Sequence, residues 1–368
     1  MAANGVTLGV SGDVMIIGQP AGAGFPDVTD ALQACDAVLI NLETTLTDRG
    51  AAADKLIRFR SSPKCVGYLA DLGVTVANIA NNHAFDYGVE GLLDTVDTLR
   101  TAGITPIGGG ADIDAALMPG VFERNGLRFA LIGFSSTLPN GCSAGPGRPG
   151  IAPARVLSRY LVDTVTIDED PGMAPLVETT AFAEDVKILA HTVEQAKAES
   201  DVVIVTCHWG VPRALLAPYQ GHLADYQRPL AHRLIDAGAD AVLGHHPHSL
   251  SEVEFYQGRP VFYSLGNFLF HARAVEDRDF GRSEPDYDLS RLHDELTRVG
   301  GLARLTWTGP GAPAHVDLLS IGIDGTGNPS IASQAQHEFA SGIVRGLSGS
   351  SVTFTDAAPA TVIEQAGS

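Results

Sequence analysis

The sequence predicts the α/β fold class, with a mostly parallel sheet that helices cover on both faces. Two observations predict it. Short β-branched apolar runs recur along the first 270 residues and end near Gly, Asn or His. Helical patterns lie between these runs, and several of them stop at a glycine such as Gly73, Gly103 or Gly238. Buried parallel strands have continuous apolar runs of this kind, and helices alternate with them along the chain.

Each strand is expected where a short apolar run is bounded by turn residues. In chain order, these runs are 6–13, 37–43, 74–83, 127–135, 202–210, 241–248 and 259–268. Apolar residues at helical spacing predict the helices between them, at 28–36, 65–73, 89–103, 183–200 and 225–239. Three later runs, at 299–309, 314–323 and 351–356, predict further strands near the C-terminus.

The domain organisation follows from the distribution of polar and turn residues. Residues 1–275 are expected to form one α/β domain, with a Gly- and Pro-dense loop at 141–153. Residues 276–298 are polar and charged and are expected to form a loop, with a lid over the site as its functional alternative. Residues 299–368 are then expected to complete the same domain with C-terminal strands and a tail. A domain boundary near 275–295 is the alternative.

Composition limits the class of partner. The chain has 368 residues, of which 45% are hydrophobic and 18% charged, so it can bury a sizeable core. Its 24 Lys and Arg residues against 43 Asp and Glu residues give a formal net charge of −19. Nucleic-acid binding needs a basic surface that displaces counterions, so no nucleic-acid partner is expected.

The expected location is the cytoplasm. The first residues, MAANGVTLGVSGDVM, lack the basic and apolar stretches of a signal peptide, and no apolar run is long enough for a membrane span. We therefore expect no membrane partner. The four cysteines have no CxxC spacing, which disfavours a disulfide framework or a thiolate zinc site. The glycines at 108–110 lack dinucleotide-binding spacing, so no organic cofactor is expected.

Polar side chains gather where the predicted strands end. These residues are Asp13, Glu43, Asn81, Asn82, His83, His208, Trp209, His245, His246, His248 and Asn267. In an open parallel sheet, ligands bind outside the carboxyl ends of the strands. Carboxylate, imidazole and amide groups suit hard to borderline divalent ions, so a metal site is expected there. His246 and His248 would point to opposite sides of an extended strand unless the chain turns at Pro247, which we expect.

Several motifs resemble a known family. GDVM (12–15), NLETTL (41–46), the NNHxxDxG block within 78–104, HWG (208–210), the GHHPH block within 228–248 and YSLGNFLF (263–270) resemble CapA, the poly-γ-glutamate capsule protein family. That family is similar to the calcineurin-like metallophosphoesterases. The resemblance covers about residues 6–270 and implies an α/β sandwich with a divalent-metal site at the strand ends.

The resemblance also implies a role for each matching residue. Asp13 corresponds to the first metal-binding aspartate, Glu43 to the bridging acid and Asn82 to the metal-binding amide. His83 corresponds to the catalytic histidine, with Asp86 three residues further on. The remaining imidazole ligands are His208, His246 and His248. Trp209, Asn81 and His245 lie beside these motifs and are expected to contact substrate, with core packing as an equal alternative for Trp209.

Two departures from the metallophosphoesterase pattern affect the expected chemistry. Met15 occupies the position of the usual histidine in the first motif, and Glu43 replaces the usual aspartate in the second. Methionine is a poor ligand for hard cations, so one of two metal positions is depleted. Two-metal phosphoester hydrolysis depends on both ions, so phosphatase activity does not follow from the resemblance. Calcium, magnesium, manganese and zinc all remain candidates for the ion.

The leading functional hypothesis is metal-dependent epimerisation of a peptide substrate by two His/Asp acid–base pairs. His83 with Asp13 or Asp86 would form one pair, and His293, beside Asp294, would belong to the second. The absence of an anchor favours soluble relatives that resemble lasso-peptide epimerases, which invert a C-terminal residue. The alternative is a metal-dependent hydrolase of phosphoester or γ-glutamyl peptide bonds. A carrier for an anionic polymer is a third reading, which the charge of −19 disfavours.

Overall fold

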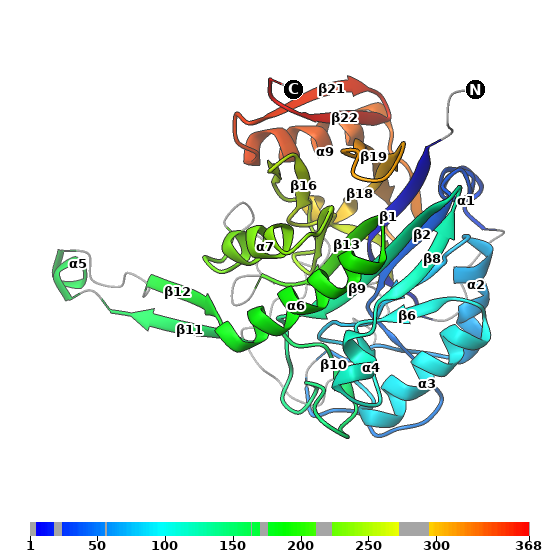
Figure 1. Cartoon of the computed structure of the whole chain (residues 1–368), viewed down its shortest axis with the longest axis vertical. Coiled ribbons are helices and arrows are strands. Elements are labelled where there is room, and N and C mark those ends of the chain that lie inside the picture. The colour runs from blue at the N-terminus through cyan, green and yellow to red at the C-terminus, as the bar shows by residue number, and fades with distance from the viewer. Residues whose placement is uncertain are drawn as a thin grey trace.

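Two β-sheets stack face to face, and helices cover the outer face of each sheet (Figure 1). The computed structural model describes residues 5–17, 24–55, 57–162, 164–169, 176–210, 223–271 and 294–367. The predicted α/β sandwich with C-terminal strands is therefore confirmed. One sheet has a parallel half and an antiparallel half, whereas the other has parallel strands at its centre and an antiparallel strand at each edge.

The first sheet contains the N-terminal strands. Its order is β21-β22-β19-β18-β1-β2-β5-β6, and β17 and β20 pair beside this path with β1 and β19. The strands are β1 (Val6–Met15), β2 (Ala37–Leu42), β5 (Val76–Asn78), β6 (Thr105–Ile107), β17 (Asn267–Phe270), β18 (Val299–Trp307), β19 (His315–Ile323), β20 (Pro329–Ile331), β21 (Val352–Ala357) and β22 (Ala360–Gln365). Strand β1 runs parallel to β2 and β17 and antiparallel to β18, so the C-terminal strands extend the same sheet.

The second sheet has the order β15-β16-β14-β13-β9-β8. Its strands are β8 (Gly120–Arg124), β9 (Leu127–Ser135), β13 (Val202–His208), β14 (Ala241–His245), β15 (Val253–Tyr256) and β16 (Arg259–Phe262). The inner strands β9, β13, β14 and β16 are mutually parallel. The candidate site lies at the carboxyl ends of β13 and β14 and of β1 and β2 in the first sheet.

Helices and short strands complete the layers. The helices are α1 (Pro26–Gln33), α2 (Val66–Asp71), α3 (Gly88–Thr101), α4 (Ile113–Leu117), α5 (Thr164–Glu169), α6 (Ala183–Glu199), α7 (Gln227–Asp236) and α9 (Gln334–Leu347), with 3₁₀ turns η1 (Pro63–Cys65) and η4 (Glu295–Arg298). The short pairs are β3 (Thr45–Leu46) with β4 (Arg60–Ser61), β7 (Gly109–Gly110) with β10 (Gly150–Ile151), and β11 (Val156–Leu161) with β12 (Leu176–Ala181). The β11–β12 ribbon projects away from the sheets (Figure 1).

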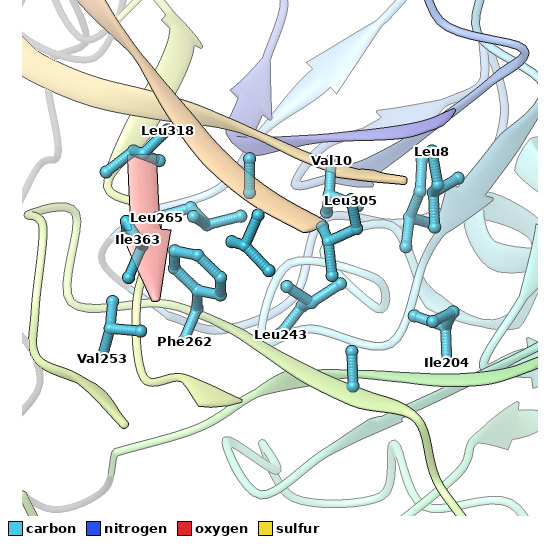
Figure 2. Packing of buried hydrophobic residues seen from close by; sticks show 14 of the residues in the cluster. Leu8, Val10, Ile204, Leu243, Val253, Phe262, Leu265, Leu305, Leu318 and Ile363 are labelled. Atoms are coloured by element: carbon cyan, nitrogen blue, oxygen red, sulfur yellow. The ribbon is translucent and has the colours of Figure 1, made fainter. Parts of the chain in front are cut away.

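The core lies on both faces of each sheet because the side chains of a strand alternate. Along β13, Val202 and Ile204 pack into the cluster between the two sheets, whereas Val203 and Val205 pack under α6 and α7. Figure 2 shows the inter-sheet cluster, in which Leu8 and Val10 of β1 and side chains of β18 and β19 face those of β13, β14 and β16. Burial on both faces explains why the strands have continuous apolar runs rather than alternating ones.

The structure contradicts the strand predicted at 259–268. The run 259–268 is not a single strand: it divides into β16 of the second sheet and β17 of the first sheet. The chain turns between them at Gly266, whose φ of 68° lies in the left-handed region that glycine adopts without strain. This crossing brings Asn267 next to Asp13 of β1.

Other differences are smaller. Beyond the short pairs β3–β4 and β7–β10, the sequence patterns did not indicate the strands β6, β8, β11, β12, β15, β20 and β22 or the helices α4, α5 and α9. Strand β5 is shorter than the run 74–83. Most of the polar loop predicted at 276–298 lies outside the described residues, and its last four residues form η4. Among the helices that the structure describes, none has the length and apolarity that a membrane span requires.

Candidate metal centre

The carboxyl ends of strands from both sheets meet at one buried cluster of carboxylates and imidazoles. Asp13 lies in β1 and Glu43 directly follows β2 of the first sheet, whereas His208 ends β13 of the second. His246 and His248 follow β14. Each of these five residues is at most 5% exposed.

Close approach of two backbones places Asp13. The Asp13 N–H donates to the Gly266 carbonyl at 2.8 Å, and Asp13 is the register partner of Asn267. A Cβ on the preceding residue, Gly12, would lie 2.2 Å from that same carbonyl oxygen. Glycine at position 12 is therefore what allows β1 and the turn before β17 to come together.

Glu43, His208 and His246 form the first group that could hold a metal ion. One ligand atom from each lies within 4.8 Å of the others. The Asn82 side-chain oxygen lies 2.8 Å from His208 Nε2, and His246 Nδ1 lies 3.0 Å from the same nitrogen. Imidazole nitrogens and carboxylate and amide oxygens converging in this way suit a borderline divalent ion.

Asp13, Glu43 and His248 form a second such group, and it shares Glu43 with the first. Asp13 accepts a hydrogen bond from the Asn41 amide at 2.8 Å, and His248 Nδ1 lies 3.3 Å from Asp13 Oδ2. Met15, two residues after Asp13, adds no ligand to this group: it packs with Phe59 and Phe270 in an apolar cluster. The second group therefore has only these three candidate ligands among the described residues, whereas the amide of Asn82 lies beside the first group as well.

Glu43 shows most clearly that these residues fit a cation. Its carboxylate is fully buried, and neither oxygen has a hydrogen-bond partner among the described residues. Burial raises the pKa of Glu43 well above its usual value, and the nearby charge of Asp13 raises it further against the opposing effect of His248. A buried carboxylate without hydrogen bonds is costly, and coordination to a cation removes that cost.

Burial also sets the protonation of the histidines. It lowers the pKa of His208 well below its usual value and the pKa of His246 to about 3, so both imidazoles are neutral, as metal ligands must be. His248 behaves oppositely. Burial lowers its pKa, but the carboxylates of Glu43 and Asp13 outweigh that effect and raise it to about 9.

The expected turn at Pro247 is confirmed. Strand β14 ends at His245, and His246 and His248 both have positive φ, at 106° and 56°. Left-handed backbone is uncommon for histidine and persists only where the surroundings enforce it. The turn lets both imidazoles reach the cluster, where their ring centroids lie 6.2 Å apart.

His83 and Asp86 form a buried pair beside the first group. His83 Nδ1 lies 2.6 Å from Asp86 Oδ2, and His83 Nε2 lies 3.9 Å from Glu43. Burial lowers the pKa of His83 to about 4 although the carboxylate of Asp86 opposes this. Of the two partners considered for His83, the structure brings Asp86 to it, whereas Asp13 contacts His248.

The other residues expected near substrate occupy supporting positions. Asn81 accepts the His83 N–H at 3.0 Å and donates to the Leu42 carbonyl, so its side chain braces the backbone. His245 Nε2 lies 3.0 Å from the Ser11 carbonyl oxygen of β1. Trp209 is fully buried, stacks on Tyr263 and donates to its carbonyl, which corresponds to the core-packing alternative. His293 lies outside the described residues.

Sequence patterns missed two residues of the site. Asn41 holds both Asp13 and His208, at 2.8 Å and 3.1 Å. Its place two residues before Glu43 in the same strand region is a signal that could have found it. Lys55 forms an ion pair with Asp86 at 2.5 Å. It lies in an irregular segment between β3 and β4, where no periodicity could have indicated it.

Comparisons with known proteins place these residues in a family context. Residues 7–272 match the family described as bacterial capsule synthesis protein PGA_cap. The chain is 33% identical over 258 residues to the PGA biosynthesis protein CapA of Bacillus subtilis, covering 69% of this chain and 58% of that protein. It is 34% identical over 256 residues to a probable polyglutamine synthesis accessory protein of Mycobacterium tuberculosis, covering 68% and 60%. The chain thus spans about three fifths of the length of these relatives.

Among solved structures, similarity extends to the NAD nucleotidase of Haemophilus influenzae, with a TM-score of 0.42 and 13% identity over 93% of this chain and 62% of that one. A hypothetical protein from Thermus thermophilus has a TM-score of 0.42 and 16% identity, over 88% of this chain and 96% of its own.

Proposed function

We propose that this chain, which belongs to the bacterial capsule synthesis protein family PGA_cap, is a metal-dependent hydrolase. The observation that carries the proposal is the buried carboxylate of Glu43, which lacks hydrogen bonds and lies beside the neutral imidazoles of His208 and His246, which could hold an ion with it. Glu43, His208, His246 and Asn82 would hold the ion, and Asp13 and His248 would support a second, weaker position. A divalent ion bound there supplies Lewis-acid polarisation of the bond to be cleaved.

The chain's own residues supply the proton transfer in this proposal. Asp86 holds the Nδ1 proton of His83, which leaves Nε2 with its lone pair on the side of Glu43. Because its pKa is lowered to about 4, His83 is neutral at neutral pH and can accept the proton of an attacking water at Nε2. Asp86 then stabilises the imidazolium that forms.

The proposed substrate class is a γ-glutamyl peptide. The name of one relative mentions PGA biosynthesis and that of another polyglutamine synthesis, so both names favour an amino-acid polymer over a phosphoester. The resemblance to the poly-γ-glutamate capsule family favours γ-glutamyl linkages within that polymer. Since the chain spans about three fifths of those relatives, the assignment to this chain rests on the shared family region and the site residues.

The test compares the two bond types directly. Purified protein is incubated with oligo-γ-glutamate or with p-nitrophenyl phosphate, each with manganese, magnesium, calcium or zinc. We expect metal-dependent cleavage of the peptide that is lost in Glu43→Gln and retained in Asp240→Asn, a buried carboxylate at the amino end of β14. Cleavage of the phosphoester alone would replace the proposed substrate. No cleavage of either with any ion would refute the hydrolase.

A second candidate function, peptide epimerisation, is favoured by one observation. The buried His83–Asp86 pair is equally suited to remove a proton from carbon next to a bound cation. The second acid–base group proposed for this reaction, His293, lies outside the described residues. In heavy water, epimerisation would place one deuterium on the Cα of a peptide without cleaving it, whereas hydrolysis would cleave it without exchange at carbon. Exchange that persists in His83→Ala would exclude this pair as the base.

A further inference from the structure

Ala53, Lys55 and Phe59, from the chain between β3 and β4, contact the His83–Asp86 pair. Ala53 donates its N–H to the Asp86 carbonyl at 2.9 Å, and Phe59 donates its N–H to Asp86 Oδ2 at 2.6 Å. The Phe59 ring also lies on the His83 imidazole, with a centroid separation of 4.0 Å. Backbone and ring contacts from one short segment therefore hold both members of the pair.

Lys55 connects this segment to both parts of the site. Its ammonium lies 2.5 Å from Asp86 Oδ1 and donates to the Asn82 carbonyl oxygen at 2.7 Å. The same carboxylate oxygen of Asp86 has no hydrogen bond besides this ion pair within the described residues. Asn82 carries the amide that reaches His208 in the first metal group. The ammonium also lies 3.4 Å from His83 Nδ1, so it contacts His83, its partner Asp86 and the peptide of a candidate metal ligand.

We propose that Lys55 is a positioning residue that holds the Asp86 carboxylate and the Asn82 peptide in the geometry that the reaction needs. The inference deepens the proposed hydrolase function and rests on it. With Lys55 bound to Oδ1, the other oxygen of Asp86 faces His83 Nδ1 and fixes the proton there. With the proton on Nδ1, Nε2 can accept the proton of the attacking water, and loss of a group that orients a site residue in this way commonly lowers activity by about 10–100-fold.

If Lys55 had a purely structural role, its loss would lower stability without a separate effect on kcat. The ion pair of Lys197 provides a control for that case. Lys197 Nζ lies 2.7 Å from Asp240 Oδ2 and donates to the Asp201 carbonyl at 2.6 Å. Its side chain is 32% exposed, against 25% for Lys55, and both paired carboxylates are at most 3% exposed. Asp240 precedes β14, whereas the site lies at the carboxyl end of that strand. The two lysine ion pairs are therefore alike in burial but lie at opposite ends of the strands, and Asp240 also pairs with Arg259 at 3.2 Å.

The experiment measures Lys55→Met and Lys197→Met in the manganese-loaded full chain. Both variants lose an ion pair to a buried carboxylate, so we expect both melting temperatures to fall, less in Lys197→Met because Asp240 keeps its pair with Arg259. The positioning role predicts that kcat for the γ-glutamyl peptide falls about 10–100-fold in Lys55→Met alone, with little change in KM. In a His83→Ala background, adding Lys55→Met should cause a smaller loss than in the native chain, because only the contact with the Asn82 peptide then still affects the site. If Lys55→Met does not fold, Lys55→Gln keeps an N–H donor and takes its place.

A second readout keeps this inference separate from the proposed function. Nitrogen-15 NMR of the metal-free protein reports which ring nitrogen of His83 carries the proton. We expect Nδ1–H in the native protein and in Lys197→Met, and a mixture of tautomers in Lys55→Met. Unchanged kcat and an unchanged tautomer in Lys55→Met would overturn the positioning role. A native protein without hydrolase activity but with this tautomer shift would refute the proposed function and leave the role of Lys55 supported.

Discussion

Replacing Glu43 with glutamine should stabilise the metal-free protein and abolish its stabilisation by metal. Asp13 and His248 form an ion pair whose charges offset each other, because the pKa of Asp13 is lowered and that of His248 is raised. Glu43 lies 3.7 Å from His248 Nε2 but has no hydrogen bond, and this contact does not offset its complete burial, because its pKa stays well above the usual value. Glutamine has nearly the same shape and no charge, so the variant removes the cost without creating a cavity.

The sign of the pH dependence follows from the raised pKa of Glu43. In the unfolded chain its pKa is about 4.3. Between that pH and its higher value in the native state, the native protein binds more protons than the unfolded chain at this residue. Stability contributed by Glu43 therefore falls as pH rises through this window. The amount by which the unfolding free energy of Glu43→Gln exceeds that of the native protein should therefore increase from pH 5 to pH 8.

The expected magnitudes can be measured. Leaving a buried polar group without a hydrogen bond costs about 1–3 kcal/mol, and the glutamine amide in Glu43→Gln still carries part of that cost. The unfolding entropy is about 2 cal/mol/K per residue, so for a chain of this length each kcal/mol of unfolding free energy shifts the melting temperature by roughly 1.3 °C. Metal-free Glu43→Gln should therefore melt roughly 1–3 °C above the native protein at pH 8. A metal at 100 times its Kd should stabilise the native protein by about 2.7 kcal/mol, or roughly 3–4 °C.

Differential scanning calorimetry with and without chelator measures both effects. Asp240→Asn is the control, because that buried carboxylate is paired with Lys197 and its loss should lower stability at both pH values. The reasoning is refuted if metal-free Glu43→Gln melts at or below the native temperature at pH 8, or if metal raises the melting temperature of both proteins equally.

Three further experiments test other parts of the site. Met15→His places an imidazole two residues from Asp13 and should strengthen the second metal group, raising the number of manganese ions bound per chain in calorimetric titration; unchanged stoichiometry would contradict the assignment of that group. Gly12→Ala places a methyl group 2.2 Å from the Gly266 carbonyl oxygen and should cost about 1–3 kcal/mol, with a parallel loss of metal affinity; a native melting temperature would show that the two backbones can separate freely. Because the pKa of His83 is lowered to about 4, log(kcat/KM) should stay level from pH 7 to about pH 5 and fall only near pH 4; a fall centred near 6.5 would show that His83 is not the buried base.

Local sequence patterns predicted the chemistry of the site but not its arrangement. Asp13, Glu43 and His208 could be found because each follows a buried apolar run, and such runs end at the same edge of parallel strands. The partner of His83 could not be chosen in the same way. Asp86 is three residues away, but the choice over Asp13 depends on Phe59 and Lys55, which come from a segment without regular structure.

The sequence by itself determined the fold class, the positions of the central strands and of the longer helices between them, and the residue types that gather at the strand ends. These features depend on periodicity and on short-range turn chemistry, which neighbouring residues encode. Only the tertiary structure decided that 259–268 divides between the two sheets, and that His246 and His248 turn into one cluster with Glu43. Those outcomes depend on contacts between residues far apart in the chain, whose energies no local pattern contains.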